Sequence, residues 1–364
     1  MWFATSDGLN KYDGYRFTVY QHDLNDTTSI GSNDLTCVFE DSKERLWVGT
    51  RHNGIELFDR ENGVFTHIYH TDENSLRSDN ITGITEDKTG VFWIATEQGI
   101  DRLEIVTERI LTGNANSRNG YSTYKFLFTS IKPDSVFGAT KENFERANVL
   151  VDSRNRIFIT TNNRIWEVKS NGKRGLYSLL ERHRFLVEDS SFIPYLLEDT
   201  ANRCLFLKTM EIVKFPDYNF NTPQKIYGDA MTLSNLTLDR HGRLWIPGID
   251  KTVRMDVRSG QMENTAPEEP TLIRALKVSK VLYTDRTGVV WIGTGGYGIL
   301  KYASEKERFH HILPQQYLYQ LLHSGNGKII TNTLYAATVK KGQPVSVHRF
   351  LDPDILKKKF RMSE

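Results

Sequence analysis

The sequence predicts an all-β fold, a β-propeller of four-stranded blades, on three observations. One phrase, a turn followed by a strand with a large apolar centre, occurs eight times along the chain. Its centres lie between 38 residues apart (Trp291 to Ile329) and 65 residues apart (Trp93 to Phe158). Each interval holds enough residues for four short strands. A period in the forties, made of short strands, is typical of blades repeated around an axis.

The elements of one blade can be assigned in order from residues 34–70. We expect strands over residues 35–40, 45–50, 55–58 and 64–69, joined by turns at 41–44, 52–54 and 59–63. An Asp at the first position of a turn can accept hydrogen bonds from backbone N–H groups, and a Gly at the last position tolerates positive φ. The turn Asp87–Gly90 has this form, and so has Asp285–Gly288.

An Asp stands six positions before the centre of the repeat in six blades, at positions 41, 87, 152, 199, 239 and 285. A metal-binding or catalytic role is possible for one Asp, but repetition in every blade favours a turn cap. The large ring at the centre of the phrase is interpreted in the same way. Face-to-face packing of sheets around a ring needs one large side chain per blade, which is Trp in the best copies.

Seven full blades and one additional unit fit the length best. We expect residues 1–316 to form a seven-bladed propeller with a truncated first blade, which lacks its innermost strand. Residues 317–364 are expected to form a further blade-like repeat that closes the ring or begins a second propeller. An eight-bladed ring is the alternative. The long gap between the third and fourth blades predicts an elaborated loop or an extra hairpin near residues 107–141.

Composition excludes several classes of function. The 47 basic and 45 acidic side chains give a net charge of +2, so neither nucleic acid nor an anionic membrane is expected as a partner. No apolar run approaches the length of a membrane-spanning helix. Cys37 and Cys204, the only cysteines, are expected to be buried and too far apart to bridge. Because CxxC and HExxH motifs are absent, we expect no metal and no cofactor.

Three segments resemble the two-component regulator propeller repeat: Trp2–Gly14, Trp47–Asp59 and Asp72–Asp87. In that family such repeats form the periplasmic sensor region of hybrid histidine kinases, which are common in Bacteroidetes. The resemblance implies a non-enzymatic, ligand-sensing domain that recognises an oligosaccharide and forms homodimers. It further implies that the kinase and the membrane span lie outside this chain. The likeness is weaker in the fourth and fifth blades, where Phe158 and Leu205 replace Trp and Lys208 stands where Thr is usual.

Candidate ligand-binding residues lie in the loops expected at one face of the ring, between the second and third strands of several blades. Amides, hydroxyls, guanidinium groups and an aromatic ring suit hydrogen bonding and stacking against sugars. His52 could act as a catalyst, but a single loop histidine is more often a surface hydrogen-bonding residue, so no catalytic residue is expected. The candidates are Arg51, His52, Asn53, Glu97, Gln98, Asn162, Asn163, Arg164 and Tyr297.

Two other functions remain open. The Trp-x-Gly-Thr style of the repeats also resembles the streptogramin lyase propellers, which would make the chain a lyase or hydrolase. A non-catalytic protein-interaction scaffold is the third class, and Phe215 and Tyr218 could then form an interface or be buried in the ring. A sensor predicts saturable binding without turnover, a lyase predicts a product, and a scaffold predicts neither.

Overall fold

The computed structural model is built from antiparallel sheets, each made of strands consecutive in the chain. Seven sheets have four strands and one has three. The described residues are 1–71, 74–111, 120–131, 147–161, 163–170, 177–185, 194–228, 234–247, 252–264, 270–303, 308–309, 321–324, 328–331, 335–338 and 346–349. Among these residues, no helix combines the length and the hydropathy needed to cross a membrane.

The first four sheets are named blades 1 to 4. Blade 1 contains β1 (Trp2–Thr5), β2 (Gly8–Tyr12) and β3 (Phe17–Tyr20). Blade 2 contains β4 (Leu35–Glu40), β5 (Leu46–Thr50), β6 (Ile55–Asp59) and β7 (Val64–Ile68). Blade 3 contains β8 (Ile81–Glu86), β9 (Phe92–Thr96), β10 (Gly99–Leu111) and β11 (Gly120–Ile131). Blade 4 contains β12 (Asn148–Val151), β13 (Ile157–Thr160), β14 (Arg164–Ser170) and β15 (Tyr177–Arg184).

The remaining sheets follow the same order. Blade 5 contains β16 (Tyr195–Asp199), β17 (Cys204–Lys208), β18 (Ile212–Pro216) and β19 (Gln224–Tyr227). Blade 6 contains β20 (Thr237–Leu238), β21 (Arg243–Pro247), β22 (Thr252–Asp256) and β23 (Met262–Asn264). Blade 7 contains β24 (Ser279–Thr284), β25 (Val290–Thr294), β26 (Ile299–Ala303) and β27 (Arg308–Phe309). The last sheet contains β28 (Leu321–Ser324), β29 (Lys328–Thr331), β30 (Tyr335–Thr338) and β31 (Ser346–Arg349).

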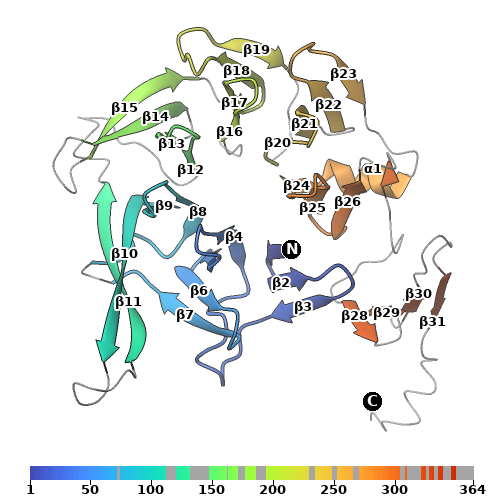
Figure 1. Cartoon of the computed structure of the whole chain (residues 1–364). Coiled ribbons are helices and arrows are strands. Elements are labelled where there is room, and N and C mark those ends of the chain that lie inside the picture. Colours follow the sequence, from blue (N-terminus) through green and yellow to red (C-terminus); the bar gives the residue numbers. More distant parts are fainter. Residues whose placement is uncertain are drawn as a thin grey trace.

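Blades 1 to 7 are arranged around a central axis, and the last sheet lies beside β3 (Figure 1). The first strands of neighbouring blades contact one another, as β4 does β8 and β8 does β12, so these strands line the centre. Blade 1 has no such strand among the described residues, and β1 lies next to β4. The expected fold class, a seven-bladed β-propeller, is confirmed. The predicted domain boundary near residue 316 stays a prediction.

The turn between the first and second strands is built around the repeated Asp. Asp41 Oδ1 accepts hydrogen bonds from the backbone N–H groups of Lys43 and Arg45, both at 2.9 Å. Its Oδ2 accepts one from Trp47 Nε1 at 2.8 Å, six residues further on. The expected turn cap is confirmed, and the structure adds that the same carboxylate holds the indole. The Asp–Trp bond recurs at 87/93 (3.0 Å), 239/245 (3.1 Å) and 285/291 (2.7 Å).

The Trp rings seal the seams between blades. Trp47 packs on Phe92 of blade 3, with the ring centres 4.9 Å apart, and Trp245 packs on Tyr302 of blade 7 at 4.8 Å. Trp291 lies 5.9 Å from Phe3 of blade 1 and thus joins the seventh blade to the first. The Asp that fixes each indole therefore also fixes the contact between one blade and the next.

Blade 3 departs most from the repeat. Its outer strands β10 and β11 are paired from Ile100–Ile131 to Leu111–Gly120, so they form an extended hairpin. Figure 1 shows the hairpin running past the other blades. The side chain of Asn74 bonds the outer edge of β11 twice, donating to Phe126 O at 3.0 Å and accepting from Phe128 N at 2.9 Å. This side chain blocks the middle of the edge against further strand pairing.

Blade 7 is preceded by a helix that the sequence analysis did not predict, α1 (Pro270–Lys277). Pro at the first position is already set for helical φ. Leu272, Ala275 and Leu276 are spaced as one helical face and are buried in the cluster that contains Trp245. Apolar spacing in such a short segment gives too weak a signal to separate a helix from a connecting loop.

Two expectations about buried residues can be checked directly. Cys204 is buried as expected, whereas Cys37 is only half-buried; both are free thiols, and burial raises the pKa of each to about 11. Phe215 and Tyr218 are buried in the cluster around Phe158, so burial in the ring is confirmed over exposure at an interface. The Tyr218 hydroxyl donates to Glu198 at 2.8 Å, and its ring lies under the guanidinium of Arg154 at 3.9 Å.

Candidate functional site

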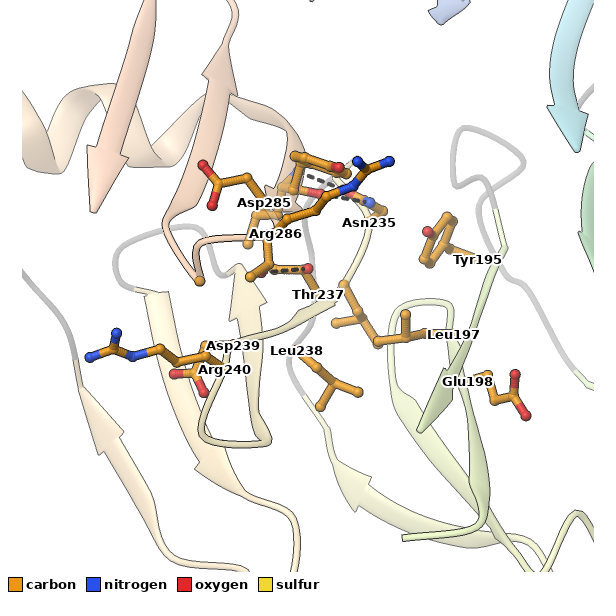
Figure 2. A pocket seen from close by; sticks show the side chains of 15 residues that line it. Tyr195, Leu197, Glu198, Asn235, Thr237, Leu238, Asp239, Arg240, Asp285 and Arg286 are labelled. Carbon is orange, nitrogen blue, oxygen red and sulfur yellow. Dashed lines mark hydrogen bonds between the residues drawn. The ribbon is translucent and has the colours of Figure 1, made fainter. Parts of the chain in front are cut away.

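A cavity with a volume of about 510 Å³ opens on the axis at blades 5, 6 and 7. Its walls come from β16, from the chain around β20, from β24 and from the turn after β24 (Figure 2). The polar and aromatic side chains that line it are Tyr195, Glu198, Asn235, Thr237, Asp239, Arg240, Tyr283, Thr284, Asp285 and Arg286.

The walls of blades 6 and 7 are held together by side chains of the first strands. Asn235 donates to Leu282 O at 3.0 Å and accepts from Leu282 N at 2.6 Å, which imitates one step of strand pairing across the seam. The hydroxyls of Thr237 and Thr284 share a hydrogen bond of 2.9 Å, drawn as a dashed line in Figure 2. This part of the cavity wall is therefore fixed before any ligand arrives.

The tyrosines give the cavity aromatic faces. Burial raises the pKa of the Tyr195 phenol, while a hydrogen bond with Asn235 acts against this rise. The side chain of Tyr283 projects from β24, and the residue is 52% exposed. One face of the cavity thus carries a fixed ring and another a solvent-facing ring. Amphipathic rings beside a few polar groups are typical of sites that bind small polar ligands.

The carboxylates of the cavity are already engaged. Glu198 accepts hydrogen bonds from the backbone N–H and the hydroxyl of Ser153, at 2.7 and 2.6 Å, besides the one from Tyr218. Asp239 and Asp285 cap their turns and hold the indoles of their own blades. A general acid or base needs an oxygen that can reach the substrate, and both oxygens of each carboxylate serve the fold instead.

The cations of the cavity lie on the turns. Arg240 follows Asp239, and Arg286 follows Asp285; both are exposed. The aliphatic part of Arg240 packs over Gly288, where a Cβ would come within 2.6 Å of it. In Figure 2 the Arg286 side chain extends toward the side of the cavity that carries Tyr195, whereas Asp285 points away.

Of the nine residues predicted from the sequence, the structure describes eight, and none of these eight lines the cavity. Asn162 lies outside the described residues. In the turn of blade 2, Arg51 Nε donates to Asp34 at 2.8 Å, Asn53 Nδ2 donates to Gly31 O at 3.0 Å, and His52 is exposed. These contacts fix the loop between blades 1 and 2.

The turns of blades 3, 4 and 7 are fixed in similar ways. Glu97 accepts from Ser78 and Asn80 at 3.1 and 3.0 Å, and Gln98 is exposed beside it. Exposed Asn163 accepts a backbone bond from blade 4, Arg164 lies 3.5 Å from Glu181, and half-buried Tyr297 packs on the cluster of Trp245. A ligand-binding role for the nine residues stays a prediction.

The residues of the cavity were missed because they lie on first strands and on the turns that follow them, not on the loops that the sequence analysis searched. A signal was present. The residue before the repeated Asp is Glu in blades 2, 3 and 5, but Val151 in blade 4, Leu238 in blade 6 and Thr284 in blade 7. Two consecutive blades without this Glu, blades 6 and 7, form part of the cavity wall together with Glu198 of blade 5.

The comparisons agree with the fold and with the repeat. The family model for the two component regulator propeller matches residues 29–52 and 75–98, which cover the first two strands of blades 2 and 3. The chain is therefore a β-propeller that carries regulator-type repeats. The resemblance to the two-component regulator propeller repeat, identified from the sequence, is confirmed. No curated protein matches the sequence.

Solved structures are similar at low identity. The β-propeller domain of Cps50 (Swd1) from Myceliophteria thermophila has a TM-score of 0.50 and 13% identity, covering 88% of this chain and 98% of that one. Two extracellular domains of B. thetaiotaomicron, named as parts of a one component and a hybrid two component system, have TM-scores of 0.46 and 0.40 and identities of 14% and 16%. The match to the first covers 94% of this chain and 46% of that chain, and the match to the second covers 97% and 57%. This chain thus spans about half the length of each.

Proposed function

We propose that this chain is a ligand-sensing, non-enzymatic propeller of a hybrid two-component regulator, and that its ligand is an oligosaccharide bound in the axial cavity. The match of two repeats to the regulator family supports the regulatory role. The proposal places the chain in the periplasm, in a homodimer, with the kinase and the membrane span in other parts of the protein.

The observation that carries the proposal is the combination of groups in the cavity. Tyr195 and Tyr283 offer aromatic faces, and the exposed guanidinium of Arg286 offers donors to a sugar hydroxyl. The volume of about 510 Å³ falls in the range of small-molecule sites. Since the three lining carboxylates are engaged by the fold, binding without turnover is favoured over the lyase or hydrolase alternative.

The position of the cavity suggests how binding could become a signal. Its walls belong to three blades, so a ligand that contacts all three stabilises one relative placement of those blades. A ligand can shift an equilibrium between two arrangements only by its difference in affinity for them. In the proposed homodimer, ligand contacts across blades 5 to 7 would favour one arrangement of the paired sensor regions.

The proposal is tested by a thermal-shift screen of the chain against plant and host oligosaccharides, followed by calorimetry and product analysis of each hit. A ligand at 100 times its Kd adds about 2.7 kcal/mol to the free energy of unfolding. We expect a shift for one glycan family without product. Tyr283→Ala should weaken that binding about tenfold, while Tyr15→Ala, which removes a ring that is 82% exposed on blade 1, should not. Turnover of a hit, or full affinity in Tyr283→Ala, would contradict the proposal.

A further inference from the structure

Two seams between blades are joined by the same pair of residues, a glutamate and a serine. Between blades 2 and 3, Glu86 accepts hydrogen bonds from the backbone N–H and the hydroxyl of Ser42, at 2.6 and 2.8 Å. Glu198 and Ser153 repeat the same pair of bonds between blades 4 and 5. In both seams a carboxylate from the first strand of one blade binds the residue that follows the turn Asp of the preceding blade.

At the cavity, the same positions carry other residues. Thr284 stands in blade 7 where Glu86 and Glu198 stand in theirs, and Arg240 of blade 6 takes the place of the serine. Arg286 occupies that serine position in blade 7. The seam between blades 6 and 7 therefore carries Arg240 on its turn and no carboxylate from the neighbouring first strand, while Arg286 lies on the turn of blade 7 at the same cavity.

Arg286 is the cation most open to a ligand. Its side chain makes no ion pair or hydrogen bond with any residue that the structure describes, and it is exposed at the cavity. The acidic residues of the cavity turns already have partners, and Asp239 forms an ion pair with Arg243 at 2.8 Å. Asp285 accepts from the Trp291 indole at 2.7 Å and from Thr287. A guanidinium that has no partner among the described residues and lies beside aromatic rings can bind the carboxylate of an acidic sugar.

We propose that the axial cavity binds an acidic saccharide and that Arg286 holds the carboxylate of a uronic acid unit. The sugar ring lies against Tyr283, and its carboxylate brings a negative charge to a cavity edge where the first strand of blade 7 has Thr284 and no carboxylate. This inference rests on the proposed sensing function and narrows its ligand class. Carboxylate geometry is favoured over a single charge because guanidinium binds the two oxygens together.

The experiment measures binding of uronate-containing tetrasaccharides by calorimetry: galacturonate, mannuronate and glucuronate types, each alongside its methyl ester, which keeps the sugar and removes the charge. We expect one acidic form to bind at least about tenfold more tightly than its ester, as charge-assisted hydrogen bonds predict. Arg286→Gln should abolish that preference. The matched control is Arg16→Gln, which changes an exposed arginine on blade 1 and should leave the preference unchanged.

A second variant adds the missing carboxylate to the protein itself. Thr284→Glu places an acid where Glu86 and Glu198 stand, so it should compete with the ligand and reduce acidic binding by about tenfold or more. Thr284→Gln has nearly the same size without the charge and should reduce it less. Circular dichroism of both variants checks that the fold is kept, because Thr284 also bonds Thr237.

The outcomes separate the two levels of the proposal. If neutral sugars or esters bind as tightly as the acids, and Tyr283→Ala still weakens them, the sensing function holds and the acidic class is wrong. If the acids bind but Arg286→Gln and Thr284→Glu bind them normally, the assigned site is wrong. If no saccharide in either the neutral or the acidic panel binds the folded chain, both proposals fall.

Discussion

The blades with a central tryptophan and the blades without one use the same aspartate in different ways. In blade 2, Asp41 binds two backbone N–H groups, the Arg45 guanidinium at 2.6 Å and the Trp47 indole. In blade 5, Asp199 binds the backbone and the side chain of Asn202, at 3.0 and 2.8 Å, and Leu205 offers no donor. The turn thus has the Asp in all of blades 2 to 7, but an indole is held by it only in the Trp blades.

The largest expected effect comes from removing the aspartate of a Trp blade. Asp41→Ala leaves the indole of Trp47 and the guanidinium of Arg45 without their acceptor, so we expect a loss of about 3–5 kcal/mol in the free energy of unfolding. Asp199→Ala should cost about 1–2 kcal/mol, because fewer buried donors lose a partner. Urea unfolding of both variants measures the difference. Equal losses would show that the indole bond adds nothing to the turn.

Replacing the indole while keeping the aspartate should have a smaller effect. Trp93→Phe deletes the bond to Asp87 and part of the contact with Tyr177, whose ring centre lies 5.4 Å away. We expect a loss of about 1–3 kcal/mol in the free energy of unfolding. Phe158→Leu in blade 4 is the control for lost ring area without a lost hydrogen bond. If Phe158→Leu lowers the free energy of unfolding more than Trp93→Phe does, ring volume and not the hydrogen bond accounts for the stability of these blades.

The smallest effect is expected from acid. Burial alone would raise the pKa of the Asp41 carboxyl, but hydrogen bonds from Trp47 and Arg45 outweigh it and hold the pKa below its ordinary value of 3.8. The pKa values of Asp239 and Asp285 are lowered in the same way. A lowered folded-state pKa gives stability that is complete above that ordinary value and is lost as pH falls through the folded pKa.

We measure the free energy of unfolding by urea between pH 7 and pH 3. The contribution of these carboxyls should stay constant down to about pH 4 and then fall. Asp41→Asn, which cannot titrate there, should fall less steeply than the parent chain in that acid window. An Asp41→Asn variant with the same slope as the parent would mean that other carboxyls carry the acid sensitivity.

Much of the fold could be predicted from the sequence because its signals are local. The turn Asp, the positive-φ residue three positions later and the central ring lie within seven residues of one another. The structure gives φ of 83° at Gly90 and 62° at Glu44, so the turn geometry persists even where Gly is replaced. Blades 4 and 5 could be placed by spacing alone, although Phe158 and Leu205 replace Trp.

The site could not be predicted in the same way because it depends on pairs of blades. The sequence analysis searched loops for polar residues, and in the structure Arg51 and Glu97 use their side chains to bind neighbouring loops. Recognising the cavity requires knowing that residue 284 contacts residue 237 across a seam. Helix α1 was missed for a related reason, since its apolar face has meaning only beside Trp245.

The Asp–Trp bond lies wholly inside one blade, and this has a consequence for how such a chain can change over generations. A segment that contains both residues carries its own turn and its own ring orientation, so it can be duplicated or exchanged as a unit. The two hydrogen bonds between Glu86 and Ser42 need one residue from each of two blades. A copy of only one of these blades therefore lacks the bonding partner. Duplication of such segments can therefore change the number of blades without loss of the turn. New recognition sites can arise at seams where two neighbouring blades no longer carry the residues that bond each other.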